Sequence, residues 1–437
     1  MPRWHADQRE GSHIKTDILI VGAGPAGLAA AASASESGAQ IDIIDDNFSS
    51  GGQIWRGGAA IQKDPRARDL WQKLEAKTNV NFHFQTRVVH ANSPHQILTE
   101  NGAVSTLFEC KKLILATGAR ELLLPFPGWT LPGVTGAGGL QALAKNGFPV
   151  DGKRVIVAGS GPLLMAVAAS LLERGAIVTH ILEQAKLRQL AQFALSLLAT
   201  PCKIAQAWTL RKNLSAVKYI SNSYVKAAFG GAQLKKIHAL INGQEEALDC
   251  DYLACGFGLI PNCDLATAIH CVMDESGDYT KVMVDQWQKS SIAQVFVAGE
   301  STGIGGVDLA LAEGYIAGWA ATDRTELAEK LFAERRHWQG FSRRLNRAFS
   351  LRPELRRLCQ SDTLVCRCED VSYEQLQTHD NWRSAKLHTR CGMGACQGRI
   401  CGAANHFLFS WNKDDQRLPF SNARLASLSQ LTMGDIA

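Results

Sequence analysis

One stretch near the start of the chain restricts the possible folds more than any other. An apolar run, Thr16–Val21, leads directly into the glycine-rich Gly22–Gly27 (GAGPAG) and an alanine-rich segment that extends to about Ser37. A second apolar run, Gln40–Ile44, ends at Asp45. Strand, glycine triplet, helix, strand and acidic residue in this order predict a βαβ unit that binds a dinucleotide.

Each part of this unit has a physical task. Gly22 allows the tight turn, Gly24 lets a pyrophosphate approach the backbone, and Gly27 permits close helix–strand packing. The N-terminus of the helix offers its unpaired N–H groups to the phosphates. Asp45 is placed to accept hydrogen bonds from the adenosine ribose.

Two later strands indicate FAD rather than NAD. Leu113–Ala116 ends in Thr117-Gly118, the form that closes the FAD domain of flavoproteins with two dinucleotide domains. Val295–Ala298 ends in Gly299-Glu300, where such flavoproteins direct an acidic side chain to the ribityl chain. The candidate FAD-binding residues are Gly22, Gly24, Pro25, Ala26, Gly27, Asp45, Asp46, Gly52, Gln53, Thr117, Gly118, Gly299 and Glu300.

A second βαβ unit starts at Lys153. It carries Gly159 and Gly161, and its second strand ends at Glu183, but Leu164 stands at the third glycine position. A side chain of that size should separate helix from strand and compromise the pyrophosphate cradle. Glu183 would suit a free ribose hydroxyl rather than a 2′-phosphate. NAD, another adenine nucleotide such as ATP, and a purely structural role all stay open for this unit.

The motifs predict an α/β flavoprotein with two dinucleotide-binding domains, the second inserted into the first. A small C-terminal domain follows, which contains the cysteines described below. The predicted limits are an N-terminal tail (1–14), an FAD-binding domain (15–150, returning at 285–325), an inserted Rossmann domain (151–284), a basic helical linker (326–358), a cysteine domain (359–405) and a C-terminal tail (406–437).

Four cysteines near the C-terminus predict a metal site. The pattern is Cys366-x-Cys368, 22 intervening residues, then Cys391-x4-Cys396. Thiolates are soft donors that suit iron–sulfur clusters or zinc, and zinc sites usually begin with a wider Cys-x2-Cys to Cys-x4-Cys spacing. The close Cys-x-Cys start favours a [2Fe–2S] cluster over zinc or unliganded thiols. Cys401 and Cys359 are the alternative ligands.

Composition excludes several classes of function. With 46 basic and 41 acidic residues, the net charge of +5 is too balanced to indicate nucleic-acid binding. The sequence shows no membrane span and no secretory signal. The 12 cysteines therefore indicate reduced thiols or metal ligands in the cytoplasm. Residues 47–56 contain no cysteine, and the inserted domain contains no Cys-x2-Cys pair, which disfavours dithiol exchange.

One segment is strongly basic. Between Arg324 and Arg357 arginines alternate with Leu, Phe and Trp. A solvated amphipathic linker helix is the simpler interpretation, and a docking surface for a partner protein is the alternative.

Together these residues resemble the flavoprotein α subunits of heteromeric, dye-linked amino-acid and opine dehydrogenases, which include opine oxidase, hydroxyproline and proline dehydrogenases and hydrogen cyanide synthase. The most specific stretches are Gly51–Arg56 (GGQIWR), Ala116–Ala142 and Ala298–Ala310. The cysteine segment resembles the [2Fe–2S] domain of the bacterioferritin-associated ferredoxin type, and this resemblance implies that the small C-terminal domain is helical. That ferredoxin closes with Cys-x2-Cys, so the fourth ligand lies between Cys396 and Cys401.

The resemblance implies that a separate β subunit, similar to D-amino-acid oxidase, oxidises the C–N bond of an amino acid, imino acid or opine. A small ferredoxin-like γ subunit is a further implied partner. Electrons would pass to the FAD and [2Fe–2S] cluster of this chain and then to a quinone, the respiratory chain or a dye, with peripheral membrane association through partners. FMN at a boundary between subunits stays open, and the resemblance assigns no catalytic residue here. The alternatives are a self-sufficient NAD(P)H-dependent FAD/iron–sulfur oxidoreductase and a zinc-binding scaffold. A thioredoxin-reductase-like enzyme would need a redox dithiol, which the sequence does not offer.

Overall fold

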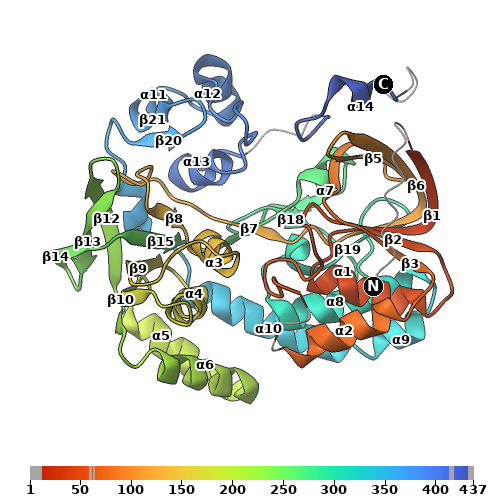
Figure 1. Cartoon of the computed structure of the whole chain (residues 1–437), viewed down its shortest axis with the longest axis horizontal. Helices are drawn as coiled ribbons and strands as arrows, with labels where there is room; N and C mark the ends of the chain where they lie inside the picture. Colours follow the sequence, from red (N-terminus) through yellow and green to blue (C-terminus); the bar gives the residue numbers. More distant parts are fainter. Residues whose placement is uncertain (1–11, 59–61, 63, 413–417, 432–437) are drawn as a thin grey trace. The chain divides into compact units, whose positions relative to one another are not determined.

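The chain divides into two compact units (Figure 1). The computed structural model describes residues 12–58, 62, 64–412 and 418–431. Unit 1 is made of residues 1–120, 261–342 and 415–437, and unit 2 is made of residues 121–260 and 343–414. The predicted N-terminal tail lies outside the described residues up to residue 11, and part of the predicted C-terminal tail lies outside them as well. The finer domain limits stay a prediction.

Unit 1 is built on a seven-stranded sheet in the order β3-β2-β1-β6-β5-β4, with β19 paired to β6. The strands β3, β2, β1, β6 and β19 run parallel, and β4 and β5 form an antiparallel meander with β6. Their bounds are β1 (Ser12–Val21), β2 (Ile41–Ile44), β3 (Val80–His83), β4 (Arg87–Ser93), β5 (Gln96–Asn101), β6 (Val104–Leu115) and β19 (Val295–Val297).

Two helices of small residues pack together in unit 1. Both α1 (Pro25–Ser35) and α8 (Val307–Ala321) are rich in alanine and are buried along most of their length. A Cβ atom at Gly314 would collide with the carbonyl oxygen of Ala26, and one at Gly318 would collide with that of Ala30. The glycines therefore permit a backbone-to-backbone approach, which fixes the segment before α8 close to the first glycine loop.

Smaller elements complete unit 1. They are α2 (Pro65–Glu75), α7 (Asp264–Ala268), β17 (Met273–Asp274), β18 (Lys281–Val282), η2 (Gly299–Thr302), α9 (Thr325–Glu329) and α14 (Leu425–Leu428). The chain passes between the two units four times. Among the described residues, three of these points lie within β7 (Ala119–Glu121), β16 (Leu259–Pro261) and α10 (Phe332–Ala348).

Unit 2 contains a parallel five-stranded sheet in the order β11-β10-β9-β15-β8. Its strands are β8 (Val134–Gly136), β9 (Arg154–Gly159), β10 (Ile177–Glu183), β11 (Lys218–Ile220) and β15 (Tyr252–Gly256). The helices that follow these strands are α3 (Ala137–Lys145), α4 (Leu163–Leu172), α5 (Leu187–Ser196), η1 (Leu197–Ala199) and α6 (Pro201–Asn213). An antiparallel sheet of β12 (Ser223–Gly230), β13 (Leu234–Ile241) and β14 (Gln244–Asp249) stands beside them.

The cysteine region is a small, mainly helical part of unit 2 with its own core around Trp382 and Leu376. Its elements are η3 (Pro353–Arg357), β20 (Leu364–Cys366), β21 (Val371–Ser372), α11 (Tyr373–Gln377), α12 (Trp382–Thr389) and α13 (Cys401–Phe409). The predicted fold class, two α/β nucleotide-fold units and a C-terminal helical cysteine region, is thereby confirmed. Among the described residues, none of the helices combines the length and apolar character needed to cross a bilayer.

Candidate functional site

The first glycine loop has the shape of a dinucleotide cradle. Gly22 has φ +108°, and a Cβ atom there would collide with the carbonyl oxygen of Ala116. A Cβ atom at Gly27 would collide with the carbonyl oxygen of Gly22. These two positions therefore require glycine for the protein's own packing.

Gly24 differs from Gly22 and Gly27 because the position of its missing Cβ atom faces open space rather than other protein atoms. A Cβ atom at Gly24 would meet no described atom within 4 Å, and Gly24 is the N-cap of α1. Gly52, with φ +59°, lies beside it, since its Cβ would be 3.2 Å from the Cα of Gly24. Unpaired N–H groups at a helix start and open space in front of a glycine are what a pyrophosphate needs.

Three more of the predicted residues surround this loop. The carboxylate of Asp45 accepts hydrogen bonds from the backbone N–H of Ala23 at 2.6 Å and of Asn47 at 2.8 Å. It is half-buried at the end of β2, where a ribose would lie. Asp46 and Gln53 are exposed, and Gln53 accepts a hydrogen bond from Arg56 at 2.8 Å.

The ends of β6 and β19 meet, as the parallel pairing of these strands predicts. The hydroxyl of Thr117 lies 2.9 Å from that of Ser301 and donates to the carbonyl oxygen of Asn262 at 2.6 Å. Gly118 and Gly299 have φ +67° and +79°, and a Cβ at Gly299 would lie 2.8 Å from that of Ala26. Residues from three distant parts of the sequence therefore converge at the start of α1.

Two carboxylates lie at this convergence. Glu300 accepts a hydrogen bond from the N–H of Gly306 at 2.8 Å through Oε1, while its buried Oε2 has no hydrogen-bond partner among the described residues. Burial raises the pKa of Glu300. A buried carboxylate oxygen without a donor suits the hydroxyl groups of a ribityl chain, so this residue fits FAD.

Glu313 is the residue that the sequence analysis did not identify. Its carboxylate accepts hydrogen bonds from the N–H of Gly299 at 2.9 Å and the hydroxyl of Thr302 at 2.7 Å. Burial raises the pKa of Glu313 to about 7. The available signal was a single acidic residue in the middle of α8, which is otherwise apolar there, because such a residue needs a specific partner.

The second glycine loop, in unit 2, has a different shape. Here α4 begins at Leu163 with Pro162 as its N-cap, whereas the corresponding Pro25 already belongs to α1. Leu164 is fully buried in the core of the domain. Gly161 has φ +100°, whereas the corresponding Gly24 has φ −76°, so the backbone of the second loop differs from that of the first.

The protein's own chain also covers this second loop. Ser160 donates to the carbonyl oxygen of Phe349 at 2.8 Å, and Gln184 donates to that of Ser350 at 3.1 Å. The N–H of Arg352 donates back to Gln184 at 3.1 Å. The segment 349–352 therefore lies across the glycine loop.

Glu183 is satisfied by the loop itself rather than left open for a ribose. Its carboxylate accepts hydrogen bonds from the N–H groups of Gly161 at 2.7 Å and Ala185 at 2.8 Å. The side chain is completely buried, and this burial raises its pKa to about 7. Asp45 makes similar bonds in unit 1 but stays accessible.

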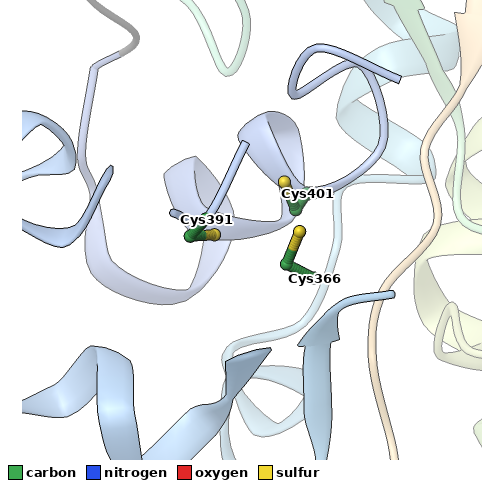
Figure 2. Close-up of side chains that lie close together, drawn as sticks. All are labelled: Cys366, Cys391 and Cys401. Atoms are coloured by element: carbon green, nitrogen blue, oxygen red, sulfur yellow. The ribbon is translucent and has the colours of Figure 1, made fainter. Parts of the chain in front are cut away.

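Three buried cysteines form a potential metal site in the C-terminal region. The sulfur atoms of Cys366, Cys391 and Cys401 lie within 4.8 Å of one another (Figure 2). Thiolates bound to one metal at about 2.3 Å in tetrahedral geometry are separated by roughly 3.8 Å, so the spacing suits a soft metal. Of the predicted four ligands the triad includes Cys366 and Cys391, together with Cys401, which had been an alternative.

The other two predicted ligands lie against each other. Cys368 is exposed, and the backbone N–H and thiol of Cys396 both contact its sulfur. A Cβ at Gly394 would collide with the Cβ of Cys368, and one at Gly392 would lie 2.6 Å from the ring of Trp382. These glycines hold the loop 391–400 against the Cys366–Cys368 segment.

The thiols of the triad share their protons. Hydrogen bonds from Cys391 and Cys401 lower the pKa of Cys366 to about 2, whereas the bond to Cys366 raises the pKa of Cys391 to about 12 and that of Cys401 as well. All three can ionise together only if a cation lies among them.

The geometry of both units defines the class of this protein. A family model for pyridine nucleotide-disulphide oxidoreductases matches residues 16–314. FAD binding fits this family and agrees with the open space in front of Gly24 in the first loop. The class is therefore that of FAD-dependent oxidoreductases with two nucleotide-fold domains.

Relatives narrow the family further. The chain is 30% identical to the HcnB component of hydrogen cyanide synthase from Pseudomonas protegens, over 88% of this chain and 89% of that protein. It is 31% identical to a component of opine oxidase from Rhizobium meliloti, over 88% and 90%. The chain belongs to the same family as these two subunits, within the pyridine nucleotide-disulphide oxidoreductases.

Solved structures agree on the fold. L-proline dehydrogenase from P. horikoshii matches with a TM-score of 0.71 at 19% identity, over 97% of this chain and 82% of that one. Thioredoxin reductase from T. acidophilum matches with a TM-score of 0.54 at 21% identity, over 71% of this chain and 98% of that one. The match to thioredoxin reductase spans a smaller share of this chain than the match to proline dehydrogenase.

Proposed function

We propose that this chain is the flavin and iron–sulfur electron-transfer subunit of a heteromeric dehydrogenase that oxidises the C–N bond of an amino acid, imino acid or opine. The observation that carries the proposal is a group of five cysteines in a chain that also holds an open FAD-type loop. Cys366, Cys391 and Cys401 lie within 4.8 Å of one another, and Cys368 interacts with both Cys366 and Cys396. A bound flavin accepts two electrons together and releases them singly, and an iron–sulfur cluster carries one, so the pair converts two-electron chemistry into one-electron flow.

The residues of unit 1 are suited to hold FAD. Gly24 and Gly52 would contact the pyrophosphate, Asp45 the adenosine ribose, and Glu300 the ribityl hydroxyls. The open space at Gly24 and the unpartnered Oε2 of Glu300 support these roles. Glu313 would position the Gly299–Thr302 turn through its two hydrogen bonds.

Five cysteines are available for a cluster that needs four. We assign Cys366, Cys368, Cys396 and Cys401 as ligands of a [2Fe–2S] cluster, which revises the prediction made from spacing alone. Cys401 is the first residue of α13, where the helix dipole stabilises a thiolate. Cys391 directly follows the C-terminal cap of α12, where the helix dipole disfavours negative charge.

Electrons enter from a partner rather than from NAD(P)H. The segment 349–352 and the buried Glu183 close the second glycine loop, which removes both the phosphate cradle and the ribose acceptor. Dithiol exchange is disfavoured as well, because residues 47–56 contain no cysteine. Unit 2 therefore acts as a scaffold for the cysteine region.

The relatives support the proposed complex. Their names describe subunits of opine oxidase and hydrogen cyanide synthase, and a shorter match, 39% of this chain, is to the alpha chain of sarcosine oxidase from a Corynebacterium. The compounds in these three names, an opine, hydrogen cyanide and sarcosine, all contain a carbon–nitrogen bond. We propose a β subunit similar to D-amino-acid oxidase as the partner that binds the substrate, and a quinone, the respiratory chain or a dye as the acceptor.

The test is anaerobic purification from the native source with analysis of flavin, iron, acid-labile sulfide and bound proteins. The proposal expects FAD, two irons and two sulfides per chain, and a co-purifying partner protein. The complex should reduce dyes with opines, hydroxyproline, proline or glycine. A chain that purifies alone and reduces dyes with NADH would refute the proposal.

A further inference from the structure

The helical segment of α5, η1 and α6 presents an apolar surface to solvent. In α5 and η1, Leu187, Ala191, Leu195 and Leu198 recur at the spacing of one helix face. All four are exposed, and the three leucines are 70%, 69% and 72% accessible. A helix of a soluble domain normally buries such a stripe.

The second helix adds two exposed apolar side chains. Ile204 and Trp208 lie one turn apart on α6, and Trp208 is 71% accessible. Neither α5 nor α6 buries a single residue, although both lie in the chain between β10 and β11 of the sheet of unit 2. Figure 1 shows both helices near β10. Contiguous exposed apolar side chains of this size indicate a surface that contacts something else.

The charged side chains of this helical segment itself are all basic. Residues 184–244 contain no aspartate or glutamate, and within 186–213 the basic residues are Lys186, Arg188, Lys203, Arg211 and Lys212. Arg344 adds a further positive charge, since it donates to the hydroxyl of Thr200 between η1 and α6 at 3.3 Å. The acidic group that faces this set is Glu354, which interacts with Lys186.

We propose that α5, η1 and α6 form a monotopic docking surface for an anionic membrane. Leucine and tryptophan on one side, with lysine and arginine beside them, are the composition of helices that lie in the lipid interface. Helices of 10 and 13 residues are about 15 and 20 Å long, too short to cross a hydrocarbon core of about 30 Å, so they would lie along the surface.

Lipid explains this composition better than a protein partner does. Lysine is depleted in protein–protein interfaces, whereas anionic headgroups attract clustered lysine and arginine. The surface goes beyond the proposed electron transfer, and lipid binding does not depend on the cofactors. Membrane binding would bring the chain close to a quinone dissolved in the bilayer, and this consequence rests on the proposed function.

The experiment is co-sedimentation of the full-length chain with vesicles of phosphatidylcholine and phosphatidylglycerol, compared with phosphatidylcholine alone. The wild type should bind the anionic vesicles, less strongly at high salt. The triple variant Leu195→Gln, Leu198→Gln, Trp208→Gln should lower the vesicle affinity by about ten- to a hundredfold. The double variant Arg188→Glu, Lys212→Glu should lose the salt-dependent part of the affinity for anionic vesicles.

The matched control is Leu425→Gln, which replaces a leucine that is 85% exposed in unit 1 and should leave binding unchanged. Hydrogen exchange should show that vesicles protect residues 187–212. Circular dichroism and flavin content report folding and the flavin site separately, so a failed proposal about FAD would not be mistaken for a failure here. Absence of binding to anionic vesicles, equal binding by the triple variant, or protection of residues 187–212 only by a co-purifying protein would overturn the proposal.

Discussion

The variant Gly24→Ala tests whether Gly24 is required for FAD binding rather than for the stability of the folded protein. Apart from the glycine's immediate neighbours and the backbone of its own helix, the added methyl group would meet no described atom within 4 Å, and the backbone at Gly24 (φ −76°, ψ −176°) is extended, which alanine adopts freely. The folded apoprotein should therefore lose no more than about 1 kcal/mol, the difference between glycine and alanine at an N-cap.

The effect on FAD should be much larger. A methyl group forced into a closely packed contact costs about 1–3 kcal/mol, which corresponds to roughly a 5- to 150-fold increase in Kd. Titration of the stripped apoprotein with FAD, followed by quenching of flavin fluorescence, measures this change. Thermal unfolding of the apoprotein measures stability independently.

Gly27→Ala is the matched comparison. Its methyl group would collide with the carbonyl oxygen of Gly22 and lie 3.4 Å from the Cβ of Ala116, so this variant should destabilise the apoprotein itself by about 1–3 kcal/mol. If Gly24→Ala bound FAD as tightly as the wild type, the pyrophosphate would not pass in front of Gly24, and the reasoning would be refuted.

Three further predictions follow from other residues. Glu313 has a pKa of about 7 in the folded protein, against 4.5 for the ordinary group. Its contribution to the free energy of unfolding is therefore fully present below pH 4.5 and is lost as the pH rises to 7. Urea unfolding should show that Glu313→Gln removes about 3 kcal/mol of this decline in stability between pH 4.5 and 7, and an unchanged pH profile would contradict the assignment. Cys391→Ser should retain the iron and sulfide of the wild type whereas Cys401→Ser loses them, and the reverse result would show that Cys391 is the ligand. NADH should leave the flavin absorbance of the isolated chain unchanged because segment 349–352 covers the second loop, and rapid bleaching would contradict this.

The first nucleotide site could be predicted from the sequence because its contacts are local or follow from strand pairing. Gly22, Gly27 and Asp45 act within one βαβ unit, whose geometry the glycine spacing determines. Thr117 and Ser301 meet because the carboxyl ends of neighbouring parallel strands lie at the same edge of the sheet. Residues predicted on these grounds converge in the structure.

Contacts between segments that are distant in the sequence could not be predicted in this way. Ser160 and Phe349 are separated by 189 positions, and a polar side chain bonded to a backbone carbonyl leaves no pattern in the sequence. The pairing of thiols also depends on how the loop 391–400 folds over Trp382, which cysteine spacing does not specify. The exposed stripe of α5 has the periodicity of an ordinary buried face, and only the structure shows that it faces solvent.

The most direct test of the central claim is a spectroscopic measurement on the anaerobic native complex mixed with its amine substrate. Rapid-freeze electron paramagnetic resonance, with the flavin absorbance recorded in parallel, would follow the redox state of this chain. The account predicts that substrate reduces both the FAD and a [2Fe–2S] cluster of this chain, and that the isolated chain shows neither change with the same substrate. Reduction of the isolated chain by the amine alone, or a complex without a reducible cluster, would contradict it.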